Sequence, residues 1–306
     1  MSSERRSLKG DRSMKVLVTG AAGKLGSKIC KTLCERGCEV RATDRRAQHE
    51  LPVQLELADS RDELAMYRLV EGVDAVIHLA NHTHAGAGPS AASLLSENVA
   101  MNSNVLTAAL ELGVSRVVFA SSIQVMLSFR HPRPRTPPFP LPYLPLDGDC
   151  PPATGTNPYA LSKSFGEEFL RVAAASRPEL ACTALRYPFL VTDAYRQRFL
   201  SSGPVAKLPR SVLDWSEATA HLTMDDAAEL AATVLERQRP GYHQFFPALA
   251  MDVAGYDLDR VISEFYPDVP LRQPLRTPRD LIDLAAVQSA TGWVPRERIR
   301  AEIIDE

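Results

Sequence analysis

The residues with the clearest chemical potential are Tyr159 and Lys163, which lie four positions apart in the segment Asn157–Lys163. A tyrosine hydroxyl has a pKa near 10, so it exchanges protons poorly at neutral pH unless a nearby cation stabilises its phenolate. Positions i and i+4 share one face of a helix, so the lysine ammonium could supply that cation or bridge to it through a bound ribose. The pair suggests the acid–base chemistry that accompanies hydride transfer. The spacing alone is weak evidence, because it is common on solvated helix faces.

The sequence around this pair predicts the beginning of a helix. Asn157 is a suitable N-cap residue and Pro158 suits the first helical position. Tyr159 then falls in the first turn, where the helix dipole favours an anion. A pair of this kind needs a redox partner, and a glycine-rich segment near the N-terminus is the candidate to bind it.

This glycine-rich segment has the pattern of a nucleotide-binding turn. Lys15–Thr19 is typical of a buried strand, and a helix is expected to run to about Arg36. Between the two, Gly20 permits a tight turn and Gly23 lets the backbone approach a pyrophosphate. Gly26 allows close packing of helix on strand, which leaves helix N–H groups directed at the phosphates.

The second predicted strand is followed by an acidic residue that bears on whether the cofactor is NAD or NADP. Glu39–Thr43 is followed by Asp44, 18 residues past Gly26, where an acidic side chain binds the adenosine ribose. The acid favours NAD, because it repels the 2′-phosphate of NADP. NADP stays possible, since the neighbouring Arg45 and Arg46 could accommodate that phosphate.

Strand-like and helix-like segments alternate through the first half of the chain. This alternation predicts an α/β fold with a doubly wound parallel sheet, which binds ligands at the carboxyl ends of its strands. Ser121 and Ser122 follow one of these strands, so a hydroxyl there could meet the nicotinamide end of a cofactor; the other interpretation is a turn or cap. The predicted strands are Val53–Leu57, Ala75–Leu79 and Arg116–Ala120, with helices near residues 60–71 and 92–112.

Four ordered motifs resemble the extended short-chain dehydrogenase/reductase superfamily, the group of NAD-dependent epimerases and dehydratases. The resemblance extends over most of the chain from Met14 and implies a Rossmann-type sheet with a smaller C-terminal substrate-binding region. It implies a dinucleotide-binding domain over residues 14–185, with a proline-rich insertion near 129–145, and a substrate region over 186–306 from which segments return to the sheet. The motifs are Thr19–Gly26, Asp74–Ala80, Arg116–Ser122 and Tyr159–Lys163.

The resemblance also implies a role for each residue of the site. Ser122 would hydrogen-bond the reacting oxygen, Tyr159 would be the acid/base, and Lys163 would hold the ribose and lower the tyrosine pKa. Glu56 and Leu57 would flank the adenine. The expected cofactor-binding residues are Gly20, Gly23, Lys24, Leu25, Gly26, Asp44, Arg45, Glu56, Leu57, Leu79, Ala80, Asn81, Asn98, Tyr159, Lys163, Tyr187 and Pro188.

The candidate substrate-binding residues lie at or shortly after the ends of predicted strands. They are His82, His84, Ser122, Gln124, Phe189 and Leu190, with Trp215 a further candidate. No metal is expected, because His78, His82 and His84 have no nearby carboxylate and the cysteines lack the paired spacing of a zinc module.

The expected reaction is the reversible interconversion of a hydroxyl and a keto group on a carbohydrate-like substrate, a sugar, sugar acid or nucleotide sugar. A dehydratase is disfavoured, because Ile123 and Gln124 stand where that branch carries an Asp-Glu pair. A sugar-nucleotide epimerase with no net redox change stays open, although an arginine pair for a nucleotide diphosphate is not evident. A non-catalytic NAD-binding sensor and an interaction protein built around the proline-rich insertion also stay open.

Composition sets the remaining expectations. The chain has 306 residues and a formal net charge of -2, which gives no electrostatic case for nucleic acid or membrane partners. It has no apolar run long enough to span a membrane and no apolar signal segment, so a cytoplasmic location is expected. Five cysteines, an odd number, are expected to stay reduced. Residues 1–13 are polar and basic and are expected to be disordered, and the resemblance implies a homodimer.

Overall fold

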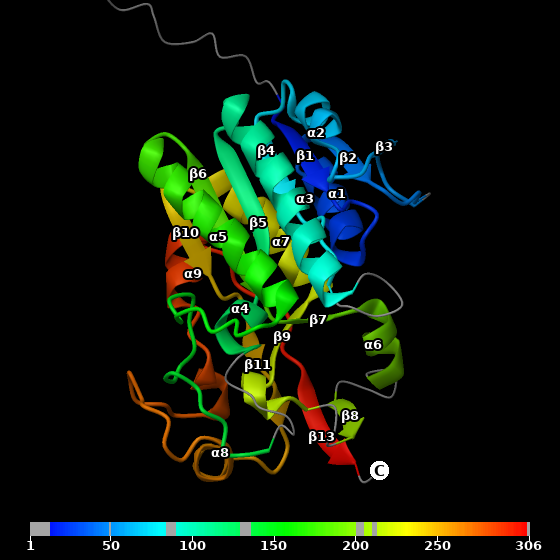
Figure 1. The fold of residues 1–306 in the computed structure, drawn as a ribbon. Helices are drawn as coiled ribbons and strands as arrows, with labels where there is room; N and C mark the ends of the chain where they lie inside the picture. The colour runs from blue at the N-terminus through cyan, green and yellow to red at the C-terminus, as the bar shows by residue number, and fades with distance from the viewer. Residues whose placement is uncertain are drawn as a thin grey trace, which may run out of the picture.

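A seven-stranded parallel sheet forms the centre of the protein, in the order β10-β6-β5-β4-β1-β2-β3 (Figure 1). The computed structural model describes residues 13–48, 50–83, 90–128, 136–199, 205–209 and 213–304. The strands are β1 (Lys15–Thr19), β2 (Glu39–Asp44), β3 (Leu55–Leu57), β4 (Ala75–His78), β5 (Arg116–Ser122), β6 (Ala181–Tyr187) and β10 (Gly241–Phe245). The order reverses between β1 and β4, which makes that pair the topological switch point of the sheet.

Helices cover both faces of this sheet. On one face α3 packs against α2 and α5, and on the other α7 packs against α1 and α9. Figure 1 shows α3 and α5 in front of the sheet and α7 behind it. The predicted α/β fold with a doubly wound sheet is therefore confirmed. The helices are α1 (Lys24–Glu35), α2 (Glu63–Val70), α3 (Ala91–Glu111), α5 (Pro158–Ser176), α7 (Met224–Arg237) and α9 (Ala285–Thr291).

Four predicted strands have different ends in the structure: β2 extends one residue further, to Asp44, β4 ends one residue earlier, at His78, and β3 and β5 differ as follows. β3 begins at Leu55 rather than Val53, because its pairing with β2 begins where Leu55 faces Ala42. β5 continues through Ser122, since Ser122 still pairs with Tyr187 of β6. Ser122 is thus the last residue of a buried strand rather than part of a loop, which holds its position more tightly.

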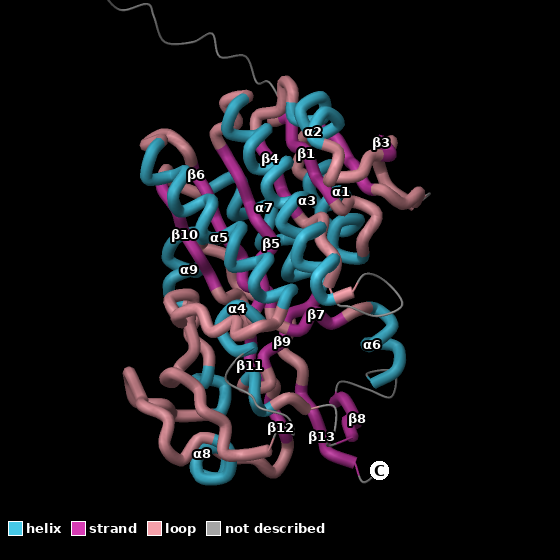
Figure 2. The backbone as a smooth tube through the Cα atoms, viewed as in Figure 1, coloured by secondary structure: helices cyan, strands magenta, loops and turns pink. Residues whose placement is uncertain are grey.

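A smaller lower lobe lies beyond the carboxyl ends of the strands (Figure 2). It contains two three-stranded sheets, in the orders β11-β9-β7 and β12-β13-β8. Its elements are α4 (Gln124–Leu127), β7 (Phe189–Val191), α6 (Asp193–Phe199), β8 (Val205–Pro209), η3 (Trp215–Glu217), β9 (Ala220–Thr223), β11 (Leu249–Ala250), β12 (Asp252–Val253), α8 (Leu258–Phe265), η4 (Pro278–Leu281) and β13 (Arg300–Ile304). The part of the chain after Arg186 supplies most of this lobe, while α7, β10 and α9 return to the large sheet.

The described part of the proline-rich segment belongs to the core of the lower lobe. Phe139, Leu141 and Leu144 are buried there, and Tyr143 is 5% exposed. Phe139 stacks on Phe265, with ring centroids 6.3 Å apart. These buried side chains anchor the segment in the lobe, whereas residues 136–138 and 140 are exposed. Residues 129–135 of the insertion lie outside the described residues, as do residues 1–12 of the N-terminal tail.

None of the helices in the described ranges is long and apolar enough to cross a membrane. The five cysteines are all free thiols, as expected. Cys30, Cys150 and Cys182 are buried, and burial raises the pKa of Cys30 and of Cys182 to about 12. These two thiols are therefore protonated core side chains at neutral pH.

Candidate active site

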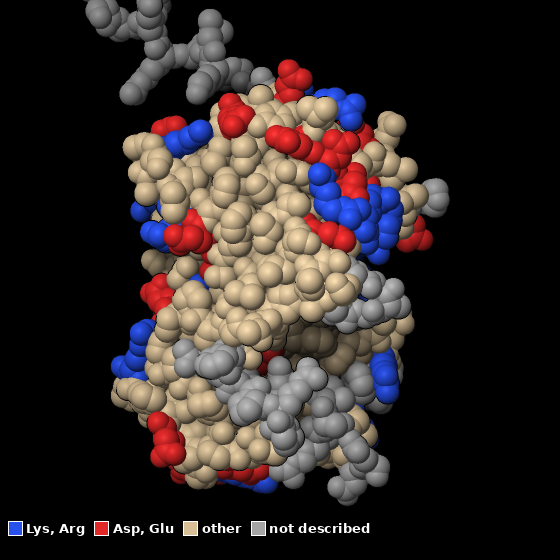
Figure 3. Space-filling view, in the orientation of Figure 1, with Lys and Arg blue, Asp and Glu red and all other residues tan. Residues whose placement is uncertain are grey.

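A cavity of about 660 Å³ opens at the switch point of the sheet, between the loops that follow β1 and β4. Figure 3 shows a hollow between the sheet-bearing upper half and the lower lobe. Gly20 begins the first loop with φ +70°, and a Cβ atom there would lie 2.9 Å from the backbone nitrogen of Ala80. A Cβ on Gly26 would lie 2.2 Å from the carbonyl oxygen of Gly20. Only glycine fits both positions, so the turn keeps its backbone N–H groups close to the cavity.

Asp44 lies at one end of the cavity. Its side chain is 8% exposed, and its carboxylate accepts hydrogen bonds from the backbone nitrogens of Ala22, at 3.2 Å, and Arg46, at 3.0 Å. Arg45 and Arg46 line the same end. The carboxylate retains acceptor capacity for ribose hydroxyls, because an ionised carboxylate offers about four acceptor sites.

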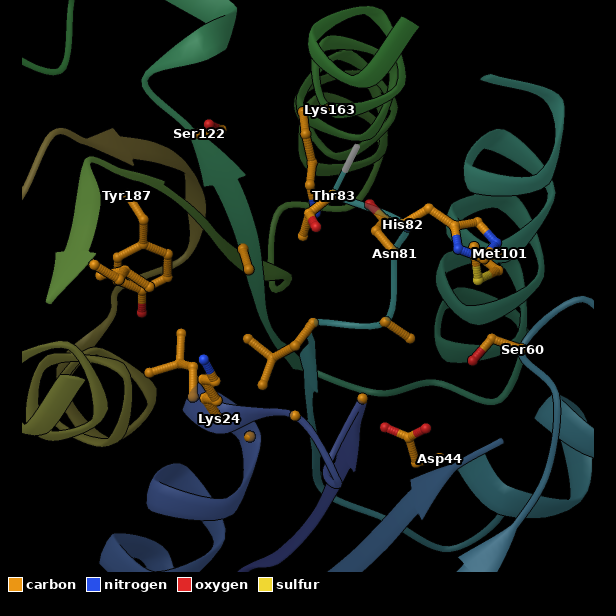
Figure 4. A pocket seen from close by; sticks show the side chains of 18 of the residues that line it. Lys24, Asp44, Ser60, Asn81, His82, Thr83, Met101, Ser122, Lys163 and Tyr187 are labelled. Atoms are coloured by element: carbon orange, nitrogen blue, oxygen red, sulfur yellow. The ribbon is translucent and has the colours of Figure 1, made fainter. Parts of the chain in front are cut away.

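Ser122, Tyr159 and Lys163 meet at the opposite end. Asn157 caps α5 as predicted, accepting from the backbone nitrogens of Tyr159 at 3.0 Å and Ala160 at 3.3 Å. This cap fixes Tyr159 in the first turn, where its hydroxyl hydrogen-bonds Ser122 at the end of β5. The Nζ atom of Lys163 lies 5.7 Å from the centroid of the Tyr159 ring. Figure 4 shows Lys163 and Ser122 at one end of the cavity and Asp44 at the other.

Burial disfavours the charged forms of both Tyr159 and Lys163. It raises the pKa of Tyr159 to about 12, against the opposing effect of the hydrogen bond with Ser122. Burial also lowers the pKa of Lys163 to about 7, while the charge of Glu167 opposes this shift. The expectation of a lowered tyrosine pKa is therefore wrong for the protein alone, because desolvation of the phenol outweighs a lysine that itself loses charge near neutrality.

A buried ion pair between Glu167 and Arg186 lies next to the site. Glu167 follows Lys163 by one helical turn and binds Arg186 of β6 through two hydrogen bonds, of 2.9 and 2.7 Å. It also accepts from Ser121, the neighbour of Ser122, at 2.5 Å. The second guanidinium amine of Arg186 donates to the carbonyl oxygens of Gly148 at 3.0 Å and Cys150 at 2.6 Å. This network joins β5, α5 and β6 next to Ser122 and Lys163.

The cavity wall contains the predicted cofactor-binding residues except Glu56, Leu57 and Asn98. Glu56 faces Arg41, 3.9 Å away, and Leu57 is 64% exposed, so these two lie outside the cavity wall. Ala58, Asp59 and Ser60, which follow the end of β3 at Leu57, line the cavity there.

Asn98 has a positioning role rather than a place in the cavity wall. It is fully buried, and its side chain accepts from the backbone nitrogen of His82 at 2.7 Å and donates to the carbonyl oxygen of the same residue at 2.9 Å. It also donates to Ser162 Oγ at 3.1 Å. Asn98 therefore fixes the loop after β4 against α5.

The predicted substrate residues divide between the cavity and its surroundings. Leu190 lines the cavity, and Phe189 is 45% exposed beside it, with its ring 5.2 Å from that of Tyr195. His82 also lines the cavity; its ring binds Glu97 at 2.9 Å and points toward α3 (Figure 4). Trp215 is a core residue that stacks on Phe265 at 4.3 Å. His84 lies outside the described residues.

Gln124 lies beside the reacting centre without lining the cavity. Its backbone nitrogen donates to Ser122 Oγ at 3.2 Å. Its side chain donates to Glu217 of the lower lobe at 2.5 Å. Gln124 therefore connects Ser122 to a carboxylate that the sequence patterns did not indicate.

Several lining residues had no signal in the sequence. Thr83 and Met101 come from the loop after β4 and from α3, and Met224 begins α7. Met101 looks like an ordinary core residue of an amphipathic helix, and Met224 like an ordinary helix start. Only the packing of α3 and α7 at the switch point brings them to the cavity.

No group of acidic, histidine or cysteine side chains within the described ranges is arranged to hold a metal ion. The ring nitrogens of His78 bind Thr19 at 2.7 Å and Asn102 at 3.0 Å, and burial lowers the pKa of this histidine to about 3. The cavity instead fits a dinucleotide: a glycine backbone cradle lies at its centre, an acid at one end and a buried lysine at the other.

This combination of fold and site defines a dinucleotide-dependent oxidoreductase. The chain matches the NAD dependent epimerase/dehydratase family over residues 16–244, and it belongs to that family. The protein is thus an NAD-linked enzyme.

Individual relatives show what this chain is similar to. It is 31% identical over 292 residues to 2-alkyl-3-oxoalkanoate reductase of Stenotrophomonas maltophilia, covering 94% of this chain and 82% of the relative. It is 30% identical over 160 residues to uronate dehydrogenase of Pseudomonas syringae pv. tomato, covering 50% and 52% of the two chains. The UDP-glucose 4-epimerase structure from Bifidobacterium longum superposes with a TM-score of 0.64 at 20% identity, covering 93% of this chain and 94% of that one.

Proposed function

We propose that this enzyme interconverts a hydroxyl and a keto group on a carbohydrate-like substrate, with NAD as the hydride carrier and Ser122, Tyr159 and Lys163 as its catalytic residues. The observation that supports this most directly is the hydrogen bond between Tyr159 and Ser122 at the end of a glycine-cradled cavity. The dinucleotide would extend from Asp44 to this pair. The substrate region would be residues 186–306, joined by the buried part of the proline-rich segment.

The chain's own residues account for the proton steps. Bound NAD supplies a hydride acceptor and a positive charge beside the tyrosine. Ser122 donates a hydrogen bond to the substrate oxygen and stabilises charge that develops there. Tyr159 takes the hydroxyl proton from that oxygen during oxidation and returns it during reduction. Lys163 is placed to hold a ribose hydroxyl and, when protonated, to favour the tyrosinate.

Two relatives support a sugar or sugar acid as substrate, since one is named a uronate dehydrogenase and one a UDP-glucose 4-epimerase. A sugar-nucleotide epimerase remains the alternative, because rotation of a transient ketone needs no further catalytic residue. A second candidate substrate is a branched 3-oxo acid, favoured by the 94% coverage of this chain in its match to 2-alkyl-3-oxoalkanoate reductase. All three use the same hydride step.

The test is to incubate the protein with NAD and a panel of aldoses, polyols, uronates and nucleotide sugars, and with NADH and branched 3-oxo acids. NADH absorbance and product stereochemistry are followed together. Net NADH from a sugar identifies a dehydrogenase, and an isomerised product without net NADH identifies an epimerase. Activity confined to the 3-oxo acids contradicts the carbohydrate assignment, and NAD binding without turnover of any compound contradicts the enzymatic one.

We also propose a homodimer formed through the outer faces of α3 and α5. In Figure 3 the front face over these two helices carries almost no charged atoms, whereas charges gather at its borders. Phe165 is 37% exposed and Val172 is 51% exposed on α5. An uncharged face with exposed apolar side chains is typical of subunit interfaces.

Replacing Phe165 with glutamate is expected to convert the dimer to a monomer, because a charge would be desolvated at the centre of this face. Light scattering should show the mass falling from that of two chains to that of one. The matched control is Val294→Glu, since Val294 is 64% exposed but follows α9 on the other side of the sheet. A wild-type monomer, or a Phe165→Glu protein that stays dimeric, would contradict the proposal.

A further inference from the structure

Buried polar side chains connect the glycine-rich turn to α5. Thr19, which precedes the turn, and Asn102 of α3 are fully buried, and His78 of β4 is 1% exposed. Thr19 Oγ1 lies 2.7 Å from His78 Nδ1, and His78 Nε2 lies 3.0 Å from Asn102 Oδ1. Asn102 Nδ2 donates to the carbonyl oxygen of Ser162 at 2.9 Å. This chain of hydrogen bonds therefore ends on the residue directly before Lys163.

Each hydrogen bond in the chain has a defined direction. A carbonyl oxygen can only accept, so the bond to Ser162 turns the amide nitrogen of Asn102 toward α5 and its oxygen toward His78. The oxygen then accepts from His78 Nε2, which leaves His78 Nδ1 to accept from the Thr19 hydroxyl. Burial keeps His78 in this neutral form, since it lowers the pKa of the histidine to about 3. The chain therefore requires one tautomer of His78 and one orientation of the Asn102 amide.

A second branch closes the chain into a ring. Thr19 Oγ1 accepts from the backbone nitrogens of Leu79 and Ala80, both at 3.3 Å. The next residue, Asn81, donates from its side-chain nitrogen to Asn102 Oδ1 at 2.9 Å. These three loop residues line the cavity, as do the proposed catalytic residues of α5. The ring therefore joins two walls of one cavity.

The packing of α5 on the sheet restrains the same helix from another side. A Cβ atom on Gly166 would lie 2.4 Å from the Phe119 ring, so the helix backbone is in direct contact with β5. Lys163 Nζ lies 4.9 Å from the centroid of that ring, and the His78 ring lies 5.8 Å from it. Phe119 thus limits how closely α5 approaches the sheet, while Asn102 holds the helix to α3.

Polar side chains at this depth cost free energy unless they are paired, and apolar side chains would fill such positions without that condition. Thr19, His78 and Asn102 are all paired. A paired network of this kind specifies one arrangement of the elements that it joins. Here it specifies how the turn of α5 before Lys163 lies against the loops after β1 and β4.

We infer that Asn102 is a positioning residue: through His78 and Ser162 it holds α5 in register with the glycine-rich turn, so that a dinucleotide bound at the turn meets Lys163. This inference rests on the proposed function and adds a residue to it. Asn102 does not line the cavity, so it acts through its neighbours.

The first test is Asn102→Leu, which removes the donor and the acceptor together. The dissociation constant of NAD, measured by calorimetry, is expected to rise about tenfold, the effect of losing roughly one net hydrogen bond. The single-turnover rate with the best substrate of the panel should fall at least about tenfold, because Lys163 shifts relative to the nicotinamide. The substrate KM should stay within about twofold, since the ring contains no residue of the lower lobe. A loss of folded protein alone would lower the rate and leave the NAD dissociation constant unchanged.

Thr183→Val is the matched control. Thr183 is fully buried on β6 and donates to Gln238 Oε1 at 2.9 Å, so the variant also removes a buried hydrogen bond. Its NAD affinity and rate should equal those of the wild type. Asn102→Ala removes the same groups as Asn102→Leu without adding volume, so the test does not depend on one variant that must fold. The inference is overturned if either Asn102 variant, once folded, binds NAD and reacts as Thr183→Val does.

Thr19→Val breaks the ring at its other end and keeps the shape of the side chain. Because Thr19 and Asn102 are joined through the ring, the double variant Thr19→Val with Asn102→Ala should raise the NAD dissociation constant at least about threefold less than the product of the two single effects. A rise equal to the full product would contradict the coupling. NAD binding needs no substrate, so changed affinity without turnover of any compound removes the proposed reaction alone, and turnover with unchanged affinity and rate removes this inference alone.

Discussion

Replacing Tyr159 with phenylalanine is expected to lower kcat by a factor on the order of 10³, because the site then has no group to exchange a proton with the substrate oxygen. Ser122 can donate a hydrogen bond to that oxygen, but a serine hydroxyl does not replace a phenol as a proton acceptor. Tyr159 hydrogen-bonds Ser122 where both residues line the cavity, so the phenol is placed to meet the substrate oxygen. The measurement is single-turnover NADH formation with the best substrate of the panel.

NAD affinity separates a chemical from a structural effect in this variant. The Tyr159→Phe variant retains the glycine-rich turn, Asp44 and Lys163. Its NAD dissociation constant should therefore stay within about tenfold of the wild-type value. Tyr242→Phe is the matched control: it removes a tyrosine hydroxyl that donates to Gln244 at 3.2 Å on the edge strand β10. A Tyr159→Phe enzyme with more than about a tenth of wild-type kcat would contradict the assigned proton transfer.

Replacing Glu167 with alanine is expected to lower the free energy of unfolding by about 3–5 kcal/mol, because the Arg186 guanidinium would stay buried without its counter-charge. Both side chains are almost completely enclosed, with exposures of 7% for Glu167 and 1% for Arg186. Ser121 would also lose its acceptor. Urea denaturation followed by circular dichroism measures the effect.

Two further variants test this explanation of the stability loss in Glu167→Ala. Glu168→Ala breaks an ion pair with Arg171 in which both side chains are more than half exposed, so its stability should hardly change. The double variant Glu167→Met with Arg186→Met should recover at least half of the loss, because it removes both buried charges and refills the space. The explanation would be contradicted if Glu167→Ala were as stable as Glu168→Ala, or if the double variant were less stable than Glu167→Ala.

The sequence predicted the elements whose local pattern and chemistry coincide. The apolar run of β1, the glycines behind it and the acid at the end of β2 all follow from what a dinucleotide turn requires of the backbone. Asn157 and Pro158 predicted the start of α5 within one residue, because capping depends on neighbouring residues alone. These local signals were enough to predict residues that line the cavity at both of its ends.

Other features depend on contacts between distant parts of the chain and had no local signal. The network of Glu167 with Arg186 joins a helix to a strand, and the Gln124–Glu217 contact joins residues 93 positions apart. The cavity wall next to β3 is formed by the residues after Glu56 and Leu57 rather than by these two, because the end of β3 is set by its pairing with β2. The tyrosine pKa was predicted in the wrong direction, because the degree of burial cannot be derived from a helical spacing.

The central claim is that a hydride passes between the substrate carbon and bound nicotinamide at Tyr159 and Ser122. Its most direct test uses aldoses and nucleotide sugars that carry deuterium on the carbinol carbon, with NAD and ordinary water. Deuterium should appear at C4 of the nicotinamide in NADH or, if the enzyme is an epimerase, should remain in the isomerised product. Products formed with their deuterium replaced by hydrogen from water, and none in the nicotinamide, would contradict hydride transfer.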